Sequence, residues 1–175
     1  QNSEIKYYAH SGNQNIYFLN DRISFVTKCN NDSLYQLRFD IKISSIKSKV
    51  KLLAVNPEKS RLNYYLPNCP DGIRDVTIFN ELIYQNVKDG CDLHITFSEG
   101  KPVFYFQSKN SNSLKLDFEF DGITEINKIE ANDDIFRITT LAGNTELVIH
   151  NSSSEAKIDG NRLFLNVVPS SSQKK

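Results

Sequence analysis

Hydrophobic and polar residues alternate over much of the chain. The alternation is clearest between Ser33 and Ser44, and it recurs over Cys91–Ser98, Leu114–Asp121 and Arg162–Val167. Successive side chains of a β-strand point to opposite faces, so a period of two predicts strands with one buried and one solvated face. Antiparallel sheets that cover a core on one side have this pattern.

The residues between these segments favour turns, because Gly and Asn tolerate positive φ and Asp side chains cap their own turns. Asp71-Gly72, Glu99-Gly100 and Asp121-Gly122 are examples. The stretch Ile78–Asn86 could form a helical turn, but its β-branched and aromatic residues disfavour a helix. Further strands are expected over Ile5–Ala9, Asn15–Leu19, Arg22–Cys29, Lys49–Val55, Arg61–Leu66, Arg74–Phe79, Val103–Lys109, Glu125–Ile129, Asp134–Thr140, Glu146–His150 and Ala156–Ile158.

These elements predict an all-β fold with little or no helix, arranged as an antiparallel β-sandwich-like meander. We expect residues 1–168 to form a single β-rich domain. Two β subdomains are the alternative, divided near 67–72 or near 121–122. Residues 169–175 are rich in Ser and Lys, which is typical of a linker or disordered tail. Together with a Met-free start at Gln1, this tail indicates a module cut from a longer protein.

The charge balance narrows the possible partners. Lys+Arg and Asp+Glu both number 21, whereas a nucleic-acid domain needs a basic excess for phosphate contacts. Hydrophobic runs are too short to span a bilayer, so no membrane insertion is expected.

Chemical candidates cluster around the turn at Asp89-Gly90. Cys91 and His94 follow it, but residues three apart in a strand lie on opposite faces, so they form a poor catalytic dyad. Cys91 belongs to the apolar face and His94 to the polar face. A disulfide between Cys69 and Cys91, which both flank Asp-Gly turns, is one hypothesis. The other is that Cys29, Cys69 and Cys91 are three small, half-buried hydrophobic residues.

Carboxylates suitable for a hydrolase also occur on the expected strands. Asp40, Asp117, Glu119 and Asp121 fall at alternate positions, which any solvated strand face shows, and a glycosidase would need two of them from different strands to face one cleft. Neither Asp89 with Asp92 nor Asn132-Asp133-Asp134 has the spacing of an EF-hand. We therefore expect no catalytic site, no metal and no cofactor.

Aromatic residues are numerous, with 8 Tyr, 11 Phe and no Trp. The pairs Tyr7-Tyr8 and Tyr64-Tyr65 each place one ring on either face of a strand, so one ring of each pair is expected to face a ligand or partner. Stacking of sugars on exposed aromatic rings makes a carbohydrate-binding module one hypothesis. The absence of Trp favours filling of a core or of an interface with the next domain.

A series of short motifs resembles the N-terminal β-rich domain of large secreted bacterial proteins of the Bacteroidota type. In that family the domain precedes propeller-type (SBBP) repeats and a C-terminal sorting or gliding-motility domain. The matching motifs are, in order, Ile5-Lys6-Tyr7-Tyr8-Ala9, Asn15-Ile16-Tyr17-Phe18, Ile23-Ser24-Phe25, Asn63-Tyr64-Tyr65, Val76, Tyr84-Gln85-Asn86-Val87-Lys88-Asp89-Gly90-Cys91-Asp92-Leu93, Leu116-Asp117-Phe118-Glu119-Phe120-Asp121-Gly122 and Ile138-Thr139-Thr140-Leu141-Ala142-Gly143.

The resemblance implies a non-catalytic structural or interaction module at the start of an exported, cell-surface or adhesin-like protein. Its partners would be neighbouring domains of the same protein, or a surface glycan or protein. The family has an apolar residue where Cys91 stands, which implies a packing role for this cysteine. The segment Leu66–Gly72 departs from the family pattern, and the resemblance assigns no role to it. A carbohydrate-binding module is the alternative function, and a hydrolase domain comes third.

Overall fold

All regular elements that the structure describes are β-strands, as the alternating pattern predicts. The computed structural model describes residues 4–28, 36–42, 50–66, 69–88, 90–108, 113–129, 135–150 and 156–171, and no helix occurs among them. The strands are β1 Tyr7–Ser11, β2 Gln14–Phe18, β3 Arg22–Lys28, β4 Gln36–Lys42, β5 Lys51–Leu66, β6 Cys69–Lys88, β7 Cys91–Ser98, β8 Lys101–Ser108, β9 Leu114–Asp121, β10 Glu125–Lys128, β11 Ile135–Thr140, β12 Gly143–Ile149, β13 Lys157–Asp159, β14 Arg162–Val167 and β15 Ser170–Ser171.

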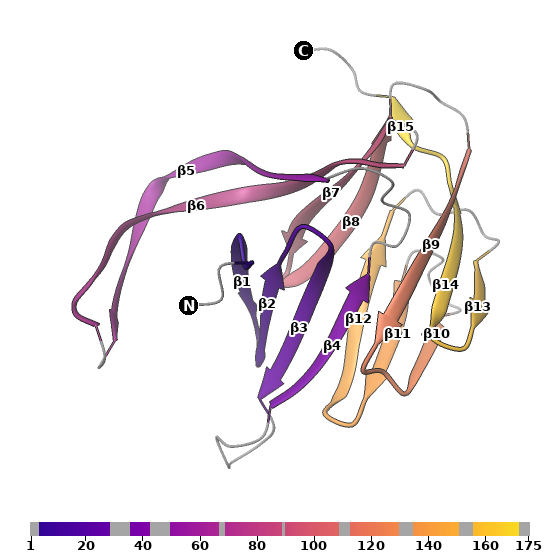
Figure 1. The fold of residues 1–175 in the computed structure, drawn as a ribbon, viewed down its shortest axis with the longest axis horizontal. Coiled ribbons are helices and arrows are strands. Elements are labelled where there is room, and N and C mark those ends of the chain that lie inside the picture. Colours follow the sequence, from indigo (N-terminus) through magenta and orange to yellow (C-terminus); the bar gives the residue numbers. More distant parts are fainter. Residues whose placement is uncertain are drawn as a thin grey trace.

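The strands form two sheets in a sandwich-like arrangement (Figure 1). One sheet, sheet A, has the order β1-β2-β3-β4-β9-β14-β13. The other, sheet B, has the order β10-β11-β12-β8-β7-β6-β5, and β15 also pairs with β8. Pairing is antiparallel except that β12 and β15 run parallel to β8. Consecutive groups of strands are therefore assigned to the two sheets in turn, beginning with β1–β4 in sheet A and β5–β8 in sheet B. The pairing of β4 with β9 joins the two parts of sheet A.

The apolar faces of the two sheets bury one common core. Phe106 on β8 of sheet B packs against Phe118 on β9 of sheet A, with ring centroids 6.2 Å apart. Within sheet A, the cross-strand pair Phe25 and Phe39 stacks at 4.5 Å. Tyr84 of β6 is fully buried, and its hydroxyl donates a 2.8 Å hydrogen bond to the carbonyl of Leu19 beside β2. Apolar packing and this hydrogen bond both join the sheets.

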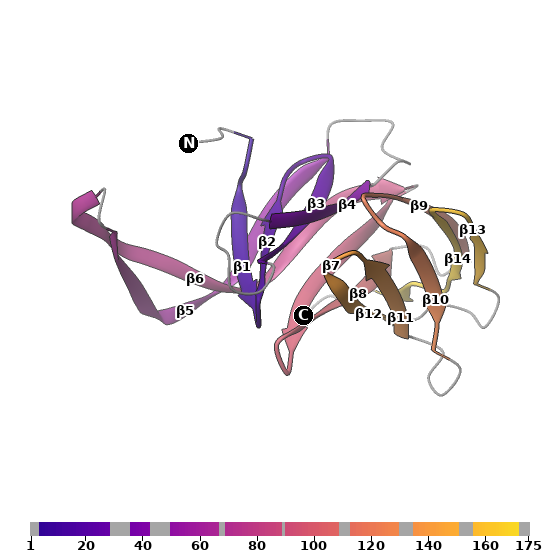
Figure 2. The ribbon, with the colours of Figure 1, turned by 90° about the horizontal axis from the view of Figure 1, so that it is seen from below.

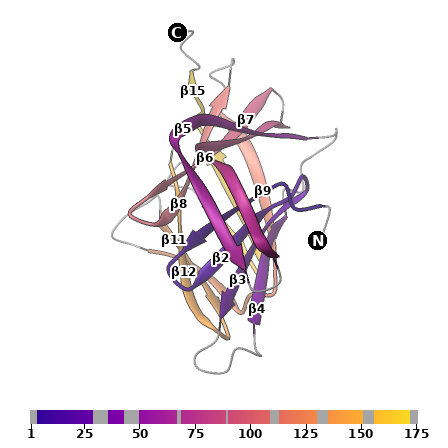
Figure 3. The same ribbon diagram turned by 90° about the vertical axis from the view of Figure 1, so that its left-hand side faces the viewer.

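Strands β5 and β6 continue beyond the sandwich as a two-stranded arm (Figures 1 and 2). Lys51–Val55 pair with Glu81–Gln85 in regular register inside sheet B. Beyond Asn56, which has a φ of 54°, the pairing shows repeated register shifts out to Leu66 and Cys69. Seen from its own side, the arm crosses in front of β2 and β3 (Figure 3). We define the arm as 56–66 and 69–80.

Several local predictions were wrong in this region. A strand was expected to end at Val55 and the next to begin at Arg61, with Asn56-Pro57 between them, and Asp71-Gly72 was expected to be a turn. Both dipeptides instead lie within the long strands of the arm. Positive φ reverses the chain at neither place: Asn56 lies between the regular pairs Val55–Glu81 and Pro57–Phe79, and Gly72, with a φ of 69°, lies where the register shifts between Tyr64 and Leu66. At the other end of the chain, Ser170–Ser171 pair with Gln107–Ser108 of β8, so the expected tail begins as part of sheet B.

Candidate functional site

A cleft with a volume of about 640 Å³ opens between the edge of sheet A and the arm of sheet B. Its walls come from β1 and β2 on one side and from β5, β6 and β7 on the other. They are mostly apolar or aromatic, and include Tyr7, Tyr8, Ala9, Phe18, Leu62, Tyr64, Val76, Ile78, Phe79, Leu82, Ile95 and Phe97. The volume lies within the range of roughly 300–1,000 Å³ that is usual for ligand sites. We refer to it as the aromatic cleft.

Two aromatic contacts connect β1 with the arm. Tyr7 meets Phe79 edge to face with centroids 6.1 Å apart, and Tyr8 meets Tyr64 at 6.2 Å with an interplanar angle of 55°. Partial burial and then the interaction with Tyr64 raise the pKa of Tyr8 to about 12. Tyr8 remains 51% exposed and Phe97 39% exposed.

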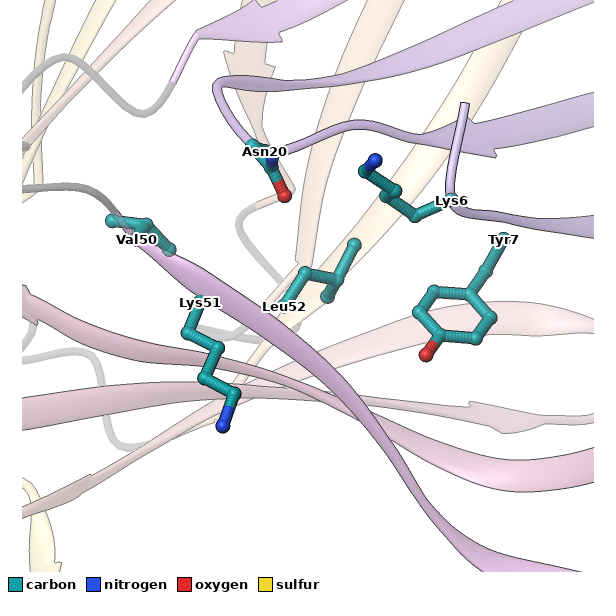
Figure 4. A pocket seen from close by; sticks show the side chains of 6 residues that line it. All are labelled: Lys6, Tyr7, Asn20, Val50, Lys51 and Leu52. Carbon is teal, nitrogen blue, oxygen red and sulfur yellow. The ribbon is translucent and has the colours of Figure 1, made fainter. Parts of the chain in front are cut away.

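A second hollow, of about 680 Å³, adjoins the aromatic cleft and shares Lys6 and Tyr7 with it (Figure 4). Leu52 and Asn20 point into this hollow, and Lys51 lies at its rim with its ammonium directed away. Among the described residues that line it, two side chains are cationic and none is acidic. Within the described residues, neither Lys6 nor Lys51 forms an ion pair. We call it the lysine hollow.

A polar cluster fixes the point where the arm leaves sheet B. The Oε1 of Glu81 lies 2.6 Å from His94 Nδ1 and also accepts a hydrogen bond from the Tyr105 hydroxyl. The Oε2 of Glu81 accepts a 2.9 Å hydrogen bond from Asn56, the first residue of the arm. His94 stacks on Tyr105 at 4.8 Å. Burial and then Glu81 raise the pKa of Tyr105. Both carboxylate oxygens thus have partners, and the arrangement supports a structural role.

Cys91 and His94 lie on opposite faces of β7, as the alternation predicts. Cys91 is fully buried in the core, where burial and then Asp92 raise its thiol pKa to about 12. The expectation that His94 faces solvent was wrong, because it is 7% exposed under the cluster with Glu81. The hypothesis of a disulfide between Cys69 and Cys91 was also wrong, since Cys91 is a free thiol. Cys69 begins β6 and Cys91 follows its far end, so the extended strand separates them. Cys29 lies outside the described residues.

The carboxylates considered for hydrolysis lie on sheet A rather than in a cleft between strands. Asp40 pairs with Arg38 at 2.7 Å, Glu119 with Lys42 at 2.9 Å, and Asp117 with Arg162. Asp121 lies 3.9 Å from the same Lys42 ammonium. These contacts form a ladder of opposite charges across β4, β9 and β14, which is a common way to stabilise a solvated sheet face.

Three of the four aromatic residues singled out in the sequence converge on the aromatic cleft: Tyr7, Tyr8 and Tyr64. Tyr65 follows in β5, and its side chain lies outside the described part of the structure. Sequence reasoning missed Phe79 and Phe97, which line the same cleft. Phe97 lies on the apolar face of the alternating segment Cys91–Ser98, which the sequence pattern assigns to the core. It is partly exposed because it lies beyond Leu82–Ile95, the last pair between β6 and β7.

No group of three or more His, Cys, Asp or Glu that could hold a metal ion occurs among the described residues. Asp92 instead accepts a 2.6 Å hydrogen bond from the backbone of Asn86, within the turn that leads into β7. Asp89 and Asn132-Asp133-Asp134 lie outside the described ranges. In the same part of the chain, no helix is long and apolar enough to cross a membrane.

The fold and the cleft define an all-β sandwich with a projecting hairpin and an open aromatic groove at its base. Residues 1–159 match the family model described as Domain of unknown function (DUF7948), so the chain belongs to this family. No curated protein and no solved structure matches the chain.

Proposed function

We propose that this domain is a non-catalytic interaction module of an exported, surface-associated protein, and that the aromatic cleft is its contact surface. The observation that carries the proposal is the cleft itself, where Tyr8, Phe79 and Phe97 remain partly exposed beside a well-packed core. Clustered exposed aromatic side chains are enriched at protein-binding surfaces, where they supply contact area at a low entropic cost. The export of the parent protein rests on the family resemblance of the motifs.

The chemistry of the described residues supports binding rather than catalysis. The Cys91 thiol is buried with a raised pKa, so it is not an activated nucleophile. The Glu81 carboxylate at the cleft accepts hydrogen bonds from His94, Tyr105 and Asn56, which leaves it little capacity to act as a base. Sugar binding is the alternative. The Tyr8 and Tyr64 rings are tilted by 55° and offer no flat stacking platform.

Site-specific photocrosslinking in the natural full-length protein tests the proposal. A benzoylphenylalanine side chain replaces Tyr64 in the cleft, and a matched one replaces Leu141, which is 86% exposed in the β11–β12 turn. We expect a discrete polypeptide product from position 64 and none from position 141, mapped by mass spectrometry to a partner or to another domain of the same chain. Equal products from both positions, or none from position 64, would contradict the proposal. Binding on a glycan array that is lost in Tyr8→Ala would favour the sugar hypothesis instead.

A further inference from the structure

The aromatic cleft runs along two strand edges, not only over strand faces. Its lining includes two unbroken runs, Lys6–His10 at the start of β1 and Val76–Leu82 of β6. A cleft over a single strand face would be lined by alternate residues, because successive side chains point to opposite sides. The unbroken runs therefore indicate that the backbone edges of β1 and β6 both border the cleft.

Both edges lack a partner strand among the described residues. Strand β1 is the last strand of sheet A and pairs only with β2. Strand β6 pairs with β7 from Leu82 onward, whereas Val76–Glu81 have a strand partner only on the β5 side. Each edge presents backbone N–H and C=O groups at the spacing of a strand, and such groups are recognised by an extended polypeptide.

The two outer edges of the arm differ in composition. The edge of β5 that faces away from β6 carries Pro57 and the charged run Glu58-Lys59-Ser60-Arg61, with a register shift in the same stretch. Proline, charge and bulges are devices that block unwanted strand pairing. The cleft-side edge of β6 has none of them from Val76 to Asn80, and the carboxylate of Glu81, which follows, is already held by Asn56, His94 and Tyr105. Pairing is thus obstructed on the solvent side and left open on the cleft side.

Charge gives the cleft a direction. Lys6 lies where the aromatic cleft meets the lysine hollow, and Lys51 lies at the rim of that hollow. The lining of the hollow carries no acidic side chain, and neither lysine has an ion-pair partner within the described ranges. An occupant with a carboxylate at this end would complement the ammonium group of Lys6, and Lys51 at the rim adds to the positive charge nearby.

We propose that the cleft receives an extended polypeptide segment of a partner, which adds as a strand along the free edge of β6, with an acidic residue toward Lys6. Alternate apolar side chains of the segment contact Tyr64 and Phe97, and its backbone pairs with Val76–Glu81. Insertion separates the Tyr7 and Phe79 rings, which close the cleft at one point. This inference rests on the proposed interaction function and specifies the chemistry of the partner.

Selection of short random peptides displayed on phage, with the full chain as bait, tests the inference. We expect enriched peptides to alternate apolar and polar residues and to carry an acidic residue near one end. Two forms of the best peptide are N-methylated at alternate backbone nitrogens, one at the odd and one at the even positions. The form whose methyl groups replace the N–H groups that face β6 loses main-chain hydrogen bonds, and its binding is expected to be about tenfold weaker or more. Replacing its acidic residue by Lys is expected to weaken binding less, because Lys6 is solvent-exposed.

Matched variants locate the binding site. Phe97→Glu places a charge in the cleft and is expected to abolish binding, whereas Leu141→Glu makes the same change at a remote exposed position and leaves it intact. Thermal unfolding by circular dichroism checks that each variant folds, and Tyr8→Glu serves if Phe97→Glu does not. The inference is overturned if no peptide is enriched relative to the Phe97→Glu bait, or if both methylated forms retain full affinity. Crosslinks from position 64 without any peptide binding would support the proposed interaction function and would contradict only the addition of a strand.

Discussion

The hydroxyl of Tyr84 provides a direct test of how the two sheets are joined. Tyr84→Phe keeps the buried ring and deletes the 2.8 Å hydrogen bond to the carbonyl of Leu19, which is itself 3% exposed. A buried acceptor that loses its donor retains its desolvation cost, and such losses amount to about 1–3 kcal/mol. The same hydroxyl also lies 3.4 Å from the carbonyl of Arg22, so the turn between β2 and β3 loses both contacts.

We expect Tyr84→Phe to lower the free energy of unfolding by about 1–2 kcal/mol, because the ring still fills its site and only the polar contact is lost. For a chain of this size, that change lowers the melting temperature by roughly 2–8 °C. Tyr84→Ala additionally removes the ring and creates a cavity, so a loss of about 3–5 kcal/mol is expected. Equilibrium unfolding in urea, followed by far-UV circular dichroism, measures both differences.

Tyr7→Phe is the matched control, because Tyr7 is half-buried and its hydroxyl forms no hydrogen bond among the described residues. Its effect is expected to stay within about 0.5 kcal/mol. If Tyr84→Phe is as mild as this control, the inter-sheet hydrogen bond contributes nothing to stability. Apolar packing such as Phe106 against Phe118 would then be sufficient to join the sheets.

Three further predictions concern single residues. Gly122→Ala is expected to lower the free energy of unfolding in urea by more than about 2 kcal/mol, since φ is +77° and an added Cβ would collide with the Arg38 carbonyl. Gly160→Ala, where φ is +58° and the space is open, is expected to lower it by only about 1 kcal/mol. Equal losses in the two variants would refute the collision. Cys91 is expected to resist alkylation at pH 8 in the folded protein and to react after unfolding, as mapped by mass spectrometry. Burial raises the pKa of Asp40, but the hydrogen bonds it accepts, chiefly from Arg38, and the charges of Arg38 and Arg22 together outweigh burial, so the net pKa is lowered. This carboxylate is therefore expected to stabilise the fold above about pH 4, and the contribution is lost as pH falls through the lowered pKa. Asp40→Asn should remove that part of the acid dependence, and an unchanged pH profile would contradict the pairing.

Outside the arm, the sequence was sufficient to predict the strands, because burial there alternates with a period of two residues. Leu116, Phe118 and Phe120 are buried and the residues between them are more exposed, as the alternation requires. The convergence of Tyr7, Tyr8 and Tyr64 on one site could not be predicted. It depends on which sheet β1 and β5 join, and strand alternation carries no information about partners far apart in the chain.

The arm was missed for a different physical reason. Asn56-Pro57 and Asp71-Gly72 are strong turn signals, and in most contexts they reverse the chain. Here Asp71-Gly72 lies within a register shift of the β5–β6 pair and Asn56-Pro57 directly precedes one, and the strand direction is retained at both. His94 was assigned to the solvated face because histidine is polar, but a carboxylate and an aromatic ring on the same face cover it. Turn propensity and strand alternation therefore gave wrong predictions at positions where contacts with residues distant in the sequence determine the conformation or the burial.

Strand β6 contributes to two parts of the molecule that are expected to differ in stability. Leu82–Tyr84 are paired on both sides, and Tyr84 extends into the core. Val76–Glu81, in contrast, belong to a two-stranded ribbon, which is marginally stable in water without a further strand. The body should therefore keep its amide protons far longer than the arm during hydrogen exchange. A segment that pairs with Val76–Glu81 would selectively protect those amides and leave the protection of β3 or β9 unchanged. Variants in the cleft and variants such as Tyr84→Phe consequently separate binding from folding, because they act on different halves of one strand.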